Sequence, residues 1–227
     1  MPEKKINHPS QNIVKPRIAK YGFVWLLLAL LLMWILSPFL ENVETHQHVL
    51  SFLLTLVTLV AAWAVSPARR SRWVALLLAL ASAGLFWMGA VGVYPKASVF
   101  ARIVLFVYYG YIIVMILRHI VAAREIDLNV LCGAAAVFIL IGVAWAISYW
   151  AISDMDPKAF TPPDRSVIPV VKFHHYLYFS LVTLTSLGYG DITPASHFAQ
   201  MWTTLEAVCG TFYLAILVAR LVSLYRR

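Results

Sequence analysis

The stretch from Thr183 to Asp191 combines residue types that suit cation binding through the backbone. Gly188 and Gly190 flank Tyr189, and glycine adopts backbone angles that other residues resist, so successive carbonyls can turn to one side. A ring of such carbonyls can replace the water shell of a dehydrated cation. Because one strand of oxygens cannot surround an ion, the stretch predicts several copies of the chain around one axis.

Residues 186–191 read Ser-Leu-Gly-Tyr-Gly-Asp and resemble the selectivity filter of potassium channels, Thr-Val-Gly-Tyr-Gly-Asp. The resemblance implies that K+ is the transported ion and that Ser186 contributes a hydroxyl and a carbonyl. It also implies carbonyl ligands from Leu187, Gly188 and Tyr189, with Gly190 permitting the outer turn. Ser186 keeps the hydroxyl of the family's threonine, and Leu187 keeps an apolar side chain. A tight glycine turn between two membrane helices is the alternative reading.

The same resemblance implies residues that support the filter. Asp191 is expected behind the filter, held by hydrogen bonds, and Tyr178 and Phe179 are similar to an aromatic cuff around it. An ordinary aromatic belt at the membrane interface is the other reading of these rings. Many family members place a glutamate in the pore helix as a partner for the aspartate, but the matching residue here is Val182. We therefore expect a filter that is braced differently, through the tyrosines.

The last apolar run, residues 198–224, resembles the family's inner helix. Gly210 matches the hinge glycine of that helix, although a glycine for close helix packing fits equally well. Carried over by position, the resemblance implies that four residues line the cavity below the filter. These are Thr211, Leu214, Val218 and Val222.

Glu206 is an acid inside this apolar run, and such a residue is costly in a membrane unless it has a partner. Thr203 precedes it by three residues, and Thr183 or Thr185 is expected nearby in space. We hypothesise that Glu206 supports the filter by bracing the pore helix from behind. If it faced the cavity instead, it would raise the local cation concentration.

The composition predicts an all-α integral membrane protein. Of the 227 residues, 62% are hydrophobic and only 12% are charged, about half the charged share of a soluble domain. The net charge of +8 comes from residues scattered through loops and termini, which indicates membrane orientation and not a nucleic-acid partner. The sequence shows no phosphate loop, metal-ligand cluster or catalytic triad, so we do not expect an enzyme.

Six apolar runs are long enough to approach a bilayer crossing of roughly 20 helical residues. They divide the chain into a basic cytoplasmic tail at 1–20, a sensor-like bundle of four helices at 21–128 and a pore domain at 129–227. Residues 172–186 are too short to span and predict a re-entrant pore helix before the filter. We expect no soluble regulatory domain. The six spans are predicted at residues 21–40, 48–65, 73–93, 99–117, 130–152 and 198–224.

The basic residues predict the orientation. Most of the 18 Lys and Arg residues lie in segments 1–20, 66–72, 118–129 and 220–227, so these segments are expected inside. Both termini are then cytoplasmic, in a multi-pass protein of the cell (inner) membrane, and the filter lies at the outer side.

A voltage sensor needs basic residues at every third position of one helix. The fourth run has Arg102 and then no Lys or Arg until Arg118. We therefore predict weak or absent voltage dependence and interpret Arg102 as an interface residue that snorkels to water.

Together these features predict a homotetrameric potassium channel that conducts K+ passively across the bilayer. Three alternatives stay open: a subunit of a potassium-uptake transporter, a weakly selective monovalent cation channel and a non-conducting regulatory subunit. The single filter segment argues against the transporter, and the intact Gly-Tyr-Gly argues against weak selectivity.

Overall fold

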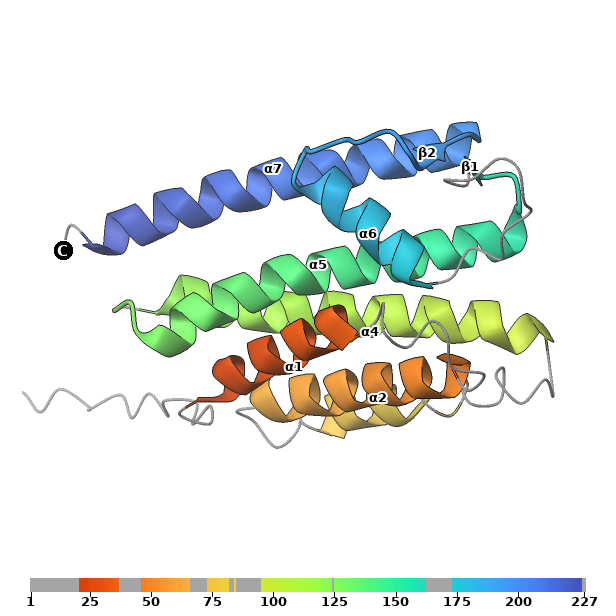
Figure 1. Cartoon of the computed structure of the whole chain (residues 1–227). Helices are drawn as coiled ribbons and strands as arrows, with labels where there is room; N and C mark the ends of the chain where they lie inside the picture. The colour runs from red at the N-terminus through yellow and green to blue at the C-terminus, as the bar shows by residue number, and fades with distance from the viewer. Residues whose placement is uncertain are drawn as a thin grey trace, which may run out of the picture.

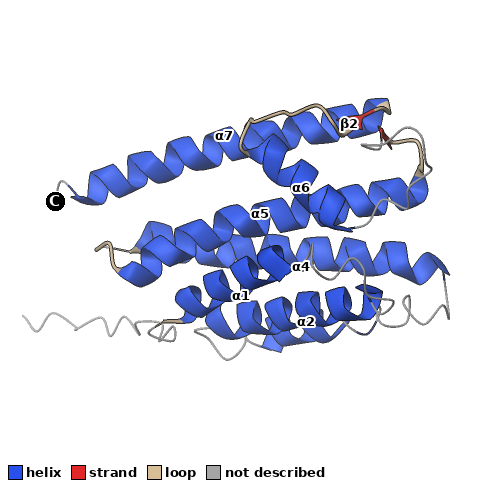
Figure 2. Ribbon diagram, viewed as in Figure 1, coloured by secondary structure: helices blue, strands red, loops and turns tan. Residues whose placement is uncertain are grey.

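The computed structural model describes residues 21–36, 46–65, 73–81, 84, 95–123, 125–161 and 173–225. This part of the chain is almost wholly helical (Figure 2). Residues 73–81 are helical as well. The labelled elements in Figure 1 are α1 (Gly22–Leu36), α2 (His46–Val65), α4 (Pro95–Ala122), α5 (Leu128–Met155), β1 (Phe160–Thr161), α6 (Phe173–Leu184), β2 (Thr193–Pro194) and α7 (His197–Tyr225).

Helix α5 is the centre of the molecule. It packs most extensively against α4, α6 and α1, and it also contacts α7 (Figure 1). A helix that is apolar all round is typical of such a buried position. Asp127 caps its first turn, because its carboxylate accepts a hydrogen bond from the backbone N–H of Val130 at 2.7 Å. Asn129 of α5 in turn accepts from the N–H of Phe23 at 3.0 Å and satisfies a donor in the first turn of α1.

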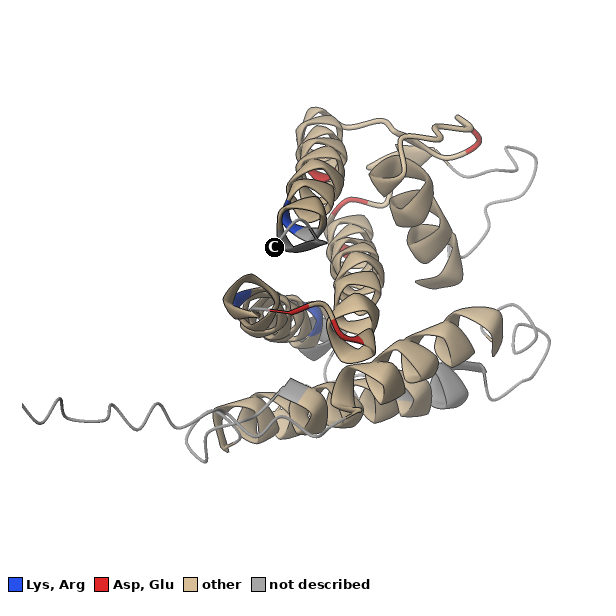
Figure 3. Ribbon diagram, turned by 90° about the vertical axis from the view of Figure 1, so that its left-hand side faces the viewer, with Lys and Arg blue, Asp and Glu red and all other residues tan. Residues whose placement is uncertain are grey.

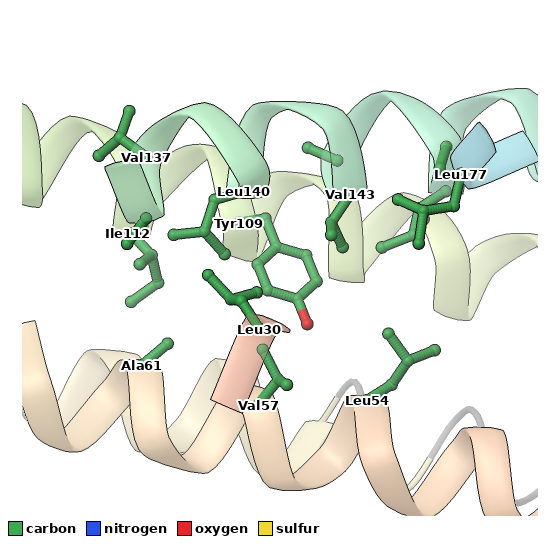
Figure 4. Packing of buried hydrophobic residues seen from close by; sticks show 14 of the residues in the cluster. Leu30, Leu54, Val57, Ala61, Tyr109, Ile112, Val137, Leu140, Val143 and Leu177 are labelled. Atoms are coloured by element: carbon green, nitrogen blue, oxygen red, sulfur yellow. The ribbon is translucent and has the colours of Figure 1, made fainter. Parts of the chain in front are cut away.

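The core between the leading helices and α5 forms around large apolar side chains. Figure 4 shows Tyr109 of α4 among Leu30 of α1, Val57 of α2 and Leu140 of α5, and all four are buried. Four helices therefore share one continuous apolar core, which attaches the leading bundle to α5.

Several predicted boundaries are wrong. The fourth predicted span, 99–117, begins earlier, at Pro95, because proline is well accommodated in the first turn of a helix. The connector expected at 118–129 is shorter, because α4 continues to Ala122. The pore helix expected at 172–186 is the 12-residue helix α6, since the chain leaves the helical conformation before the filter begins. The predicted tail 1–20 and residues 82, 83 and 85–93 of the third predicted span lie outside the described residues.

Three helices in the described ranges are long and apolar enough to cross a membrane: Val99–Ala122, Leu128–Met155 and His197–Arg220. Gly22–Leu36 and Phe52–Ala64 are shorter apolar helices. Figure 3 shows long stretches of helix without a charged side chain. These features are those of a membrane protein, since a bilayer excludes unpaired charges from its core.

Helix α6 lies between α5 and α7 (Figure 1). After α6 the chain runs to β2, which pairs antiparallel with β1 through Phe160 opposite Pro194. The N–H of Ala195 also donates to the carbonyl of Ala159 at 2.8 Å. The segment that follows residues 186–191 is therefore tethered to the end of α5.

Candidate functional site

The backbone alternates in hand along residues 186–190. Ser186, Gly188 and Gly190 have φ angles of 59°, 58° and 77°, whereas Leu187 and Tyr189 lie outside the positive-φ region. Alternation of left- and right-handed residues aligns successive N–H groups on one side of the chain and so directs the carbonyls to the other. Ser186 adopts this conformation without being glycine, at a cost of roughly 1–2 kcal/mol.

The N–H side of this segment faces the pore helix. The N–H of Ser186 donates to the carbonyl of Thr183 at 3.0 Å, and the N–H of Leu187 donates to that of Val182 at 2.9 Å. Residues 185–191 are exposed in the single chain. The carbonyl side is thus not covered by the rest of the described chain.

Asp191 has a partner in the pore helix. The hydroxyl of Tyr178 donates to Oδ2 of Asp191 at 2.8 Å, and its ring stacks on that of Tyr189, with 6.4 Å between centroids and 8° between planes. Desolvation and then the hydrogen bond to Asp191 raise the pKa of Tyr178 to about 12. The phenol is therefore protonated, and a donor, at neutral pH.

Phe179 lies elsewhere. It is 5% exposed, and its ring packs against Tyr149 of α5 at 5.1 Å and Phe160 of β1 at 5.7 Å. The two aromatic residues predicted to form a cuff therefore have different contacts. Tyr178 contacts Asp191 and Tyr189 of the predicted filter, and Phe179 packs α6 against α5 and β1.

Glu206 is fully buried where α5, α6 and α7 meet. Its carboxyl group is hydrogen-bonded to the hydroxyls of Ser180 in α6 and Tyr149 in α5. The oxygen of Ser180 also lies 2.8 Å from the carbonyl oxygen of Gly142. The residue of α6 that bonds to Glu206 is therefore Ser180, and not Thr183 or Thr185, which the sequence suggested as neighbours.

Gly210 is a point of close contact. A Cβ atom added to it would lie 2.4 Å from the carbonyl oxygen of Leu184, the last residue of α6. Helix α7 is uninterrupted through this position. The structure thus supports the reading of Gly210 as a close-packing residue, because any side chain here would push α6 away.

The side chains expected to line the cavity are all exposed in the single chain: Thr211, Leu214, Val218 and Val222. Their neighbours Phe212 and Ile216 are also exposed, at 63% and 68%. Exposure alone therefore does not distinguish a cavity wall from a contact between copies.

The predicted environment of Arg102 is wrong. It does not snorkel to water, since it is only 8% exposed. Its guanidinium forms an ion pair with Asp154 and lies 3.7 Å from the ring centroid of Trp150, both in α5. A buried cation needs such partners, and Asp154 lies just beyond the predicted end of the fifth span, 130–152, whereas α5 continues to Met155.

Four further residues hold the pore elements together and were not singled out from the sequence. Besides Ser180 and Tyr149, the hydroxyl of Tyr213 donates to the carbonyl of Ala134 at 2.6 Å. Arg220 donates to the carbonyls of Val121 and Ala123 at 2.7 and 2.9 Å. The available signal was a polar side chain inside an apolar run, the same feature that drew attention to Glu206.

Two comparisons with known proteins bear on the C-terminal part of the chain. Residues 136–227 match the family model described as ion channel. Two pore potassium channel c of Oryza sativa subsp. japonica is 34% identical over 89 residues, which cover 39% of this chain and 18% of that protein. The chain thus spans less than a fifth of the length of this relative.

The part of the chain that contains α6, residues 186–191 and α7 is therefore similar to ion channel domains, within a chain whose helices are apolar enough for a membrane. For this part of the chain, the match points to ion transport and not to catalysis.

Proposed function

We propose that four copies of this chain form a potassium-selective channel that conducts K+ passively across the cell (inner) membrane. In this arrangement the carbonyls of residues 186–189 and the hydroxyl of Ser186 coordinate the dehydrated ion. Each chain spans the bilayer six times, with both termini cytoplasmic and α6 re-entering from the outer side. Opening depends weakly or not at all on voltage.

One observation carries the proposal: the alternating positive φ angles at Ser186, Gly188 and Gly190. The N–H groups of Ser186 and Leu187 donate hydrogen bonds to α6, which leaves the carbonyls of the segment in a row on the other side. Such a row coordinates a monovalent cation once it is repeated around an axis.

The unpartnered surface of α7 supports assembly. Only 11% of its most apolar window is buried within the chain, against 72% for α5. Large apolar side chains exposed along it include Phe198, Met201, Phe212, Ile216 and Val218. Lipid can cover part of this surface. The non-helical segment that contains Leu187 and Tyr189 has a polar backbone, however, and needs protein or water around it.

The test is ion flux into liposomes reconstituted with the full chain. The proposal predicts uptake down a K+ gradient and much less with Na+, and a 227-residue chain that runs as a tetramer. Gly188→Ala should abolish selective uptake, because alanine resists a φ of 58°. The matched control is Gly110→Ala in α4, where an added Cβ meets nothing within 4 Å.

Other outcomes would favour the alternatives. Equal K+ and Na+ flux would indicate a weakly selective cation channel. Absence of flux from a well-folded tetramer would indicate a non-conducting regulatory subunit.

A further inference from the structure

Glu206 is placed so that its hydrogen bonds report its protonation state. The oxygen of Ser180 is within bonding distance of both the Glu206 carboxyl group and the carbonyl of Gly142. A serine hydroxyl carries one proton, whereas a carboxylate and a carbonyl are acceptors only. With an ionised Glu206, Ser180 would have to serve two acceptors with a single proton.

A neutral carboxylic acid resolves this. In that state the Glu206 hydroxyl would donate to Ser180, which leaves the Ser180 proton for the carbonyl of Gly142, and the other Glu206 oxygen would accept from Tyr149. Every close contact then has one donor and one acceptor. These hydrogen bonds link α7 to α6 through Ser180, and they reach α5 at two points, Gly142 and Tyr149.

The charge balance agrees with this assignment. Glu206 is 0% exposed, and the groups that face it are Ser180 of α6 and Tyr149 of α5. Among the described residues, the ion pair that the structure contains is Arg102 with Asp154, so no cation compensates Glu206. An unpaired carboxylate at membrane depth is strongly disfavoured.

We propose that Glu206 is a neutral carboxylic acid that positions the pore helix by donating a hydrogen bond to Ser180. It adds no charge to the conduction path. Its contribution to conduction, which rests on the proposed channel function, is to fix α6 against α5 and α7 and so to hold the filter in place.

Infrared spectroscopy of the full chain in lipid vesicles at neutral pH tests the protonation state directly. A carbonyl band of a protonated carboxylic acid should be present in the wild type and absent in Glu206→Gln. Glu125→Gln, in an exposed segment of the chain, makes the same chemical change and should leave the band in place. If the wild type lacks the band, the proposal is overturned, whether or not the protein conducts.

Flux assays test the positioning role. Gln retains a donor and an acceptor, so Glu206→Gln should conduct K+ within about twofold of the wild type. Glu206→Ala leaves Ser180 and Tyr149 without their partner and should lower tetramer yield or flux by about tenfold or more. A folded Glu206→Gln tetramer with flux as low as that of Glu206→Ala would contradict the proposal. A wild type without flux would refute the channel function but leave the infrared result decisive.

Discussion

At the scale of single residues, the proposed filter depends on positions where this chain uses an unusual residue. Ser186 occupies a left-handed conformation that glycine would adopt at less cost. Unlike glycine, however, serine provides a hydroxyl at this position. Tyr178 supplies the donor for Asp191, in a pore helix that has Val182 where a carboxyl group was expected from the resemblance. A phenol and a carboxylate thus form the contact behind the filter.

Replacing Tyr178 with Phe removes this donor and keeps the ring. We expect a lower K+ over Na+ flux ratio and a faster decline of conduction, because Asp191 loses its tie to α6. Liposome flux of the variant and the wild type, measured side by side, checks this. An unchanged ratio and time course would show that the bond contributes nothing.

The same contact gives a pH prediction. The pKa of Tyr178 is raised to about 12, so the donor is fully present below the ordinary tyrosine pKa and is lost as the pH rises through that higher value. Wild-type selectivity should therefore be constant between about pH 6 and 9. A titration of the flux ratio within that window that Tyr178→Phe abolishes would contradict this assignment.

At the scale of elements, the pore helix is fixed at both ends and in the middle. Phe173 packs against Trp150 near its start, with 5.7 Å between ring centroids. Ser180 bonds to Glu206 in the middle, and Leu184 meets Gly210 at its end. These contacts add to the buried apolar side chains of α6, and together they hold this short helix against α5 and α7.

Gly210→Ala tests whether this glycine packs or bends. The added Cβ would lie 2.4 Å from the Leu184 carbonyl oxygen, so we expect a loss of roughly 1–3 kcal/mol of stability, together with lower flux. Gly110→Ala is the control and should be neutral or stabilising by up to about 1 kcal/mol. Thermal unfolding of both tetramers decides between the readings. A normal melting temperature with altered opening would identify a hinge instead.

Arg220 connects the inner end of α7 to the end of α4. It donates to two carbonyls in a region where the last turn of a helix lacks partners of its own, and a cation there also complements the helix dipole. Arg220→Gln should therefore lower stability by about 1 kcal/mol. Arg118→Gln, an exposed residue of the same turn of α4, removes the same charge and should have a smaller effect.

The sequence alone predicted the apolar helices and singled out residues 186–191 and Glu206, because composition, glycine spacing and an acid in an apolar run are local signals. It did not identify the partners of Glu206, since Tyr149 and Ser180 are 57 and 26 residues away and meet it only after packing. Arg102 was misread for the same reason. Its partner in the buried ion pair is Asp154, which lies just beyond the predicted end of the fifth span at residue 152.

At the scale of the whole molecule, the leading helices and the pore elements are joined by a shared core and by Arg102. Arg102 of α4 is held against Asp154 and Trp150 of α5, so it is not free to move with the membrane potential. The bundle is thus expected to be a rigid support for the pore.

Recordings in planar bilayers check this. Conductance should change little with voltage, because one immobile charge supplies no gating charge. Arg102→Gln should leave the voltage dependence flat and reduce tetramer stability, since Asp154 is left without its partner. Steep voltage activation that disappears in Arg102→Gln would show that this arginine is a gating charge.

The most direct test of the account is a structure of the full chain in lipid, determined by electron cryo-microscopy in K+. The account predicts a four-fold particle in which ion density lies on the axis at the carbonyls of Gly188 and Tyr189. A monomer or dimer, or a filter segment whose carbonyls point away from a common axis, would contradict it.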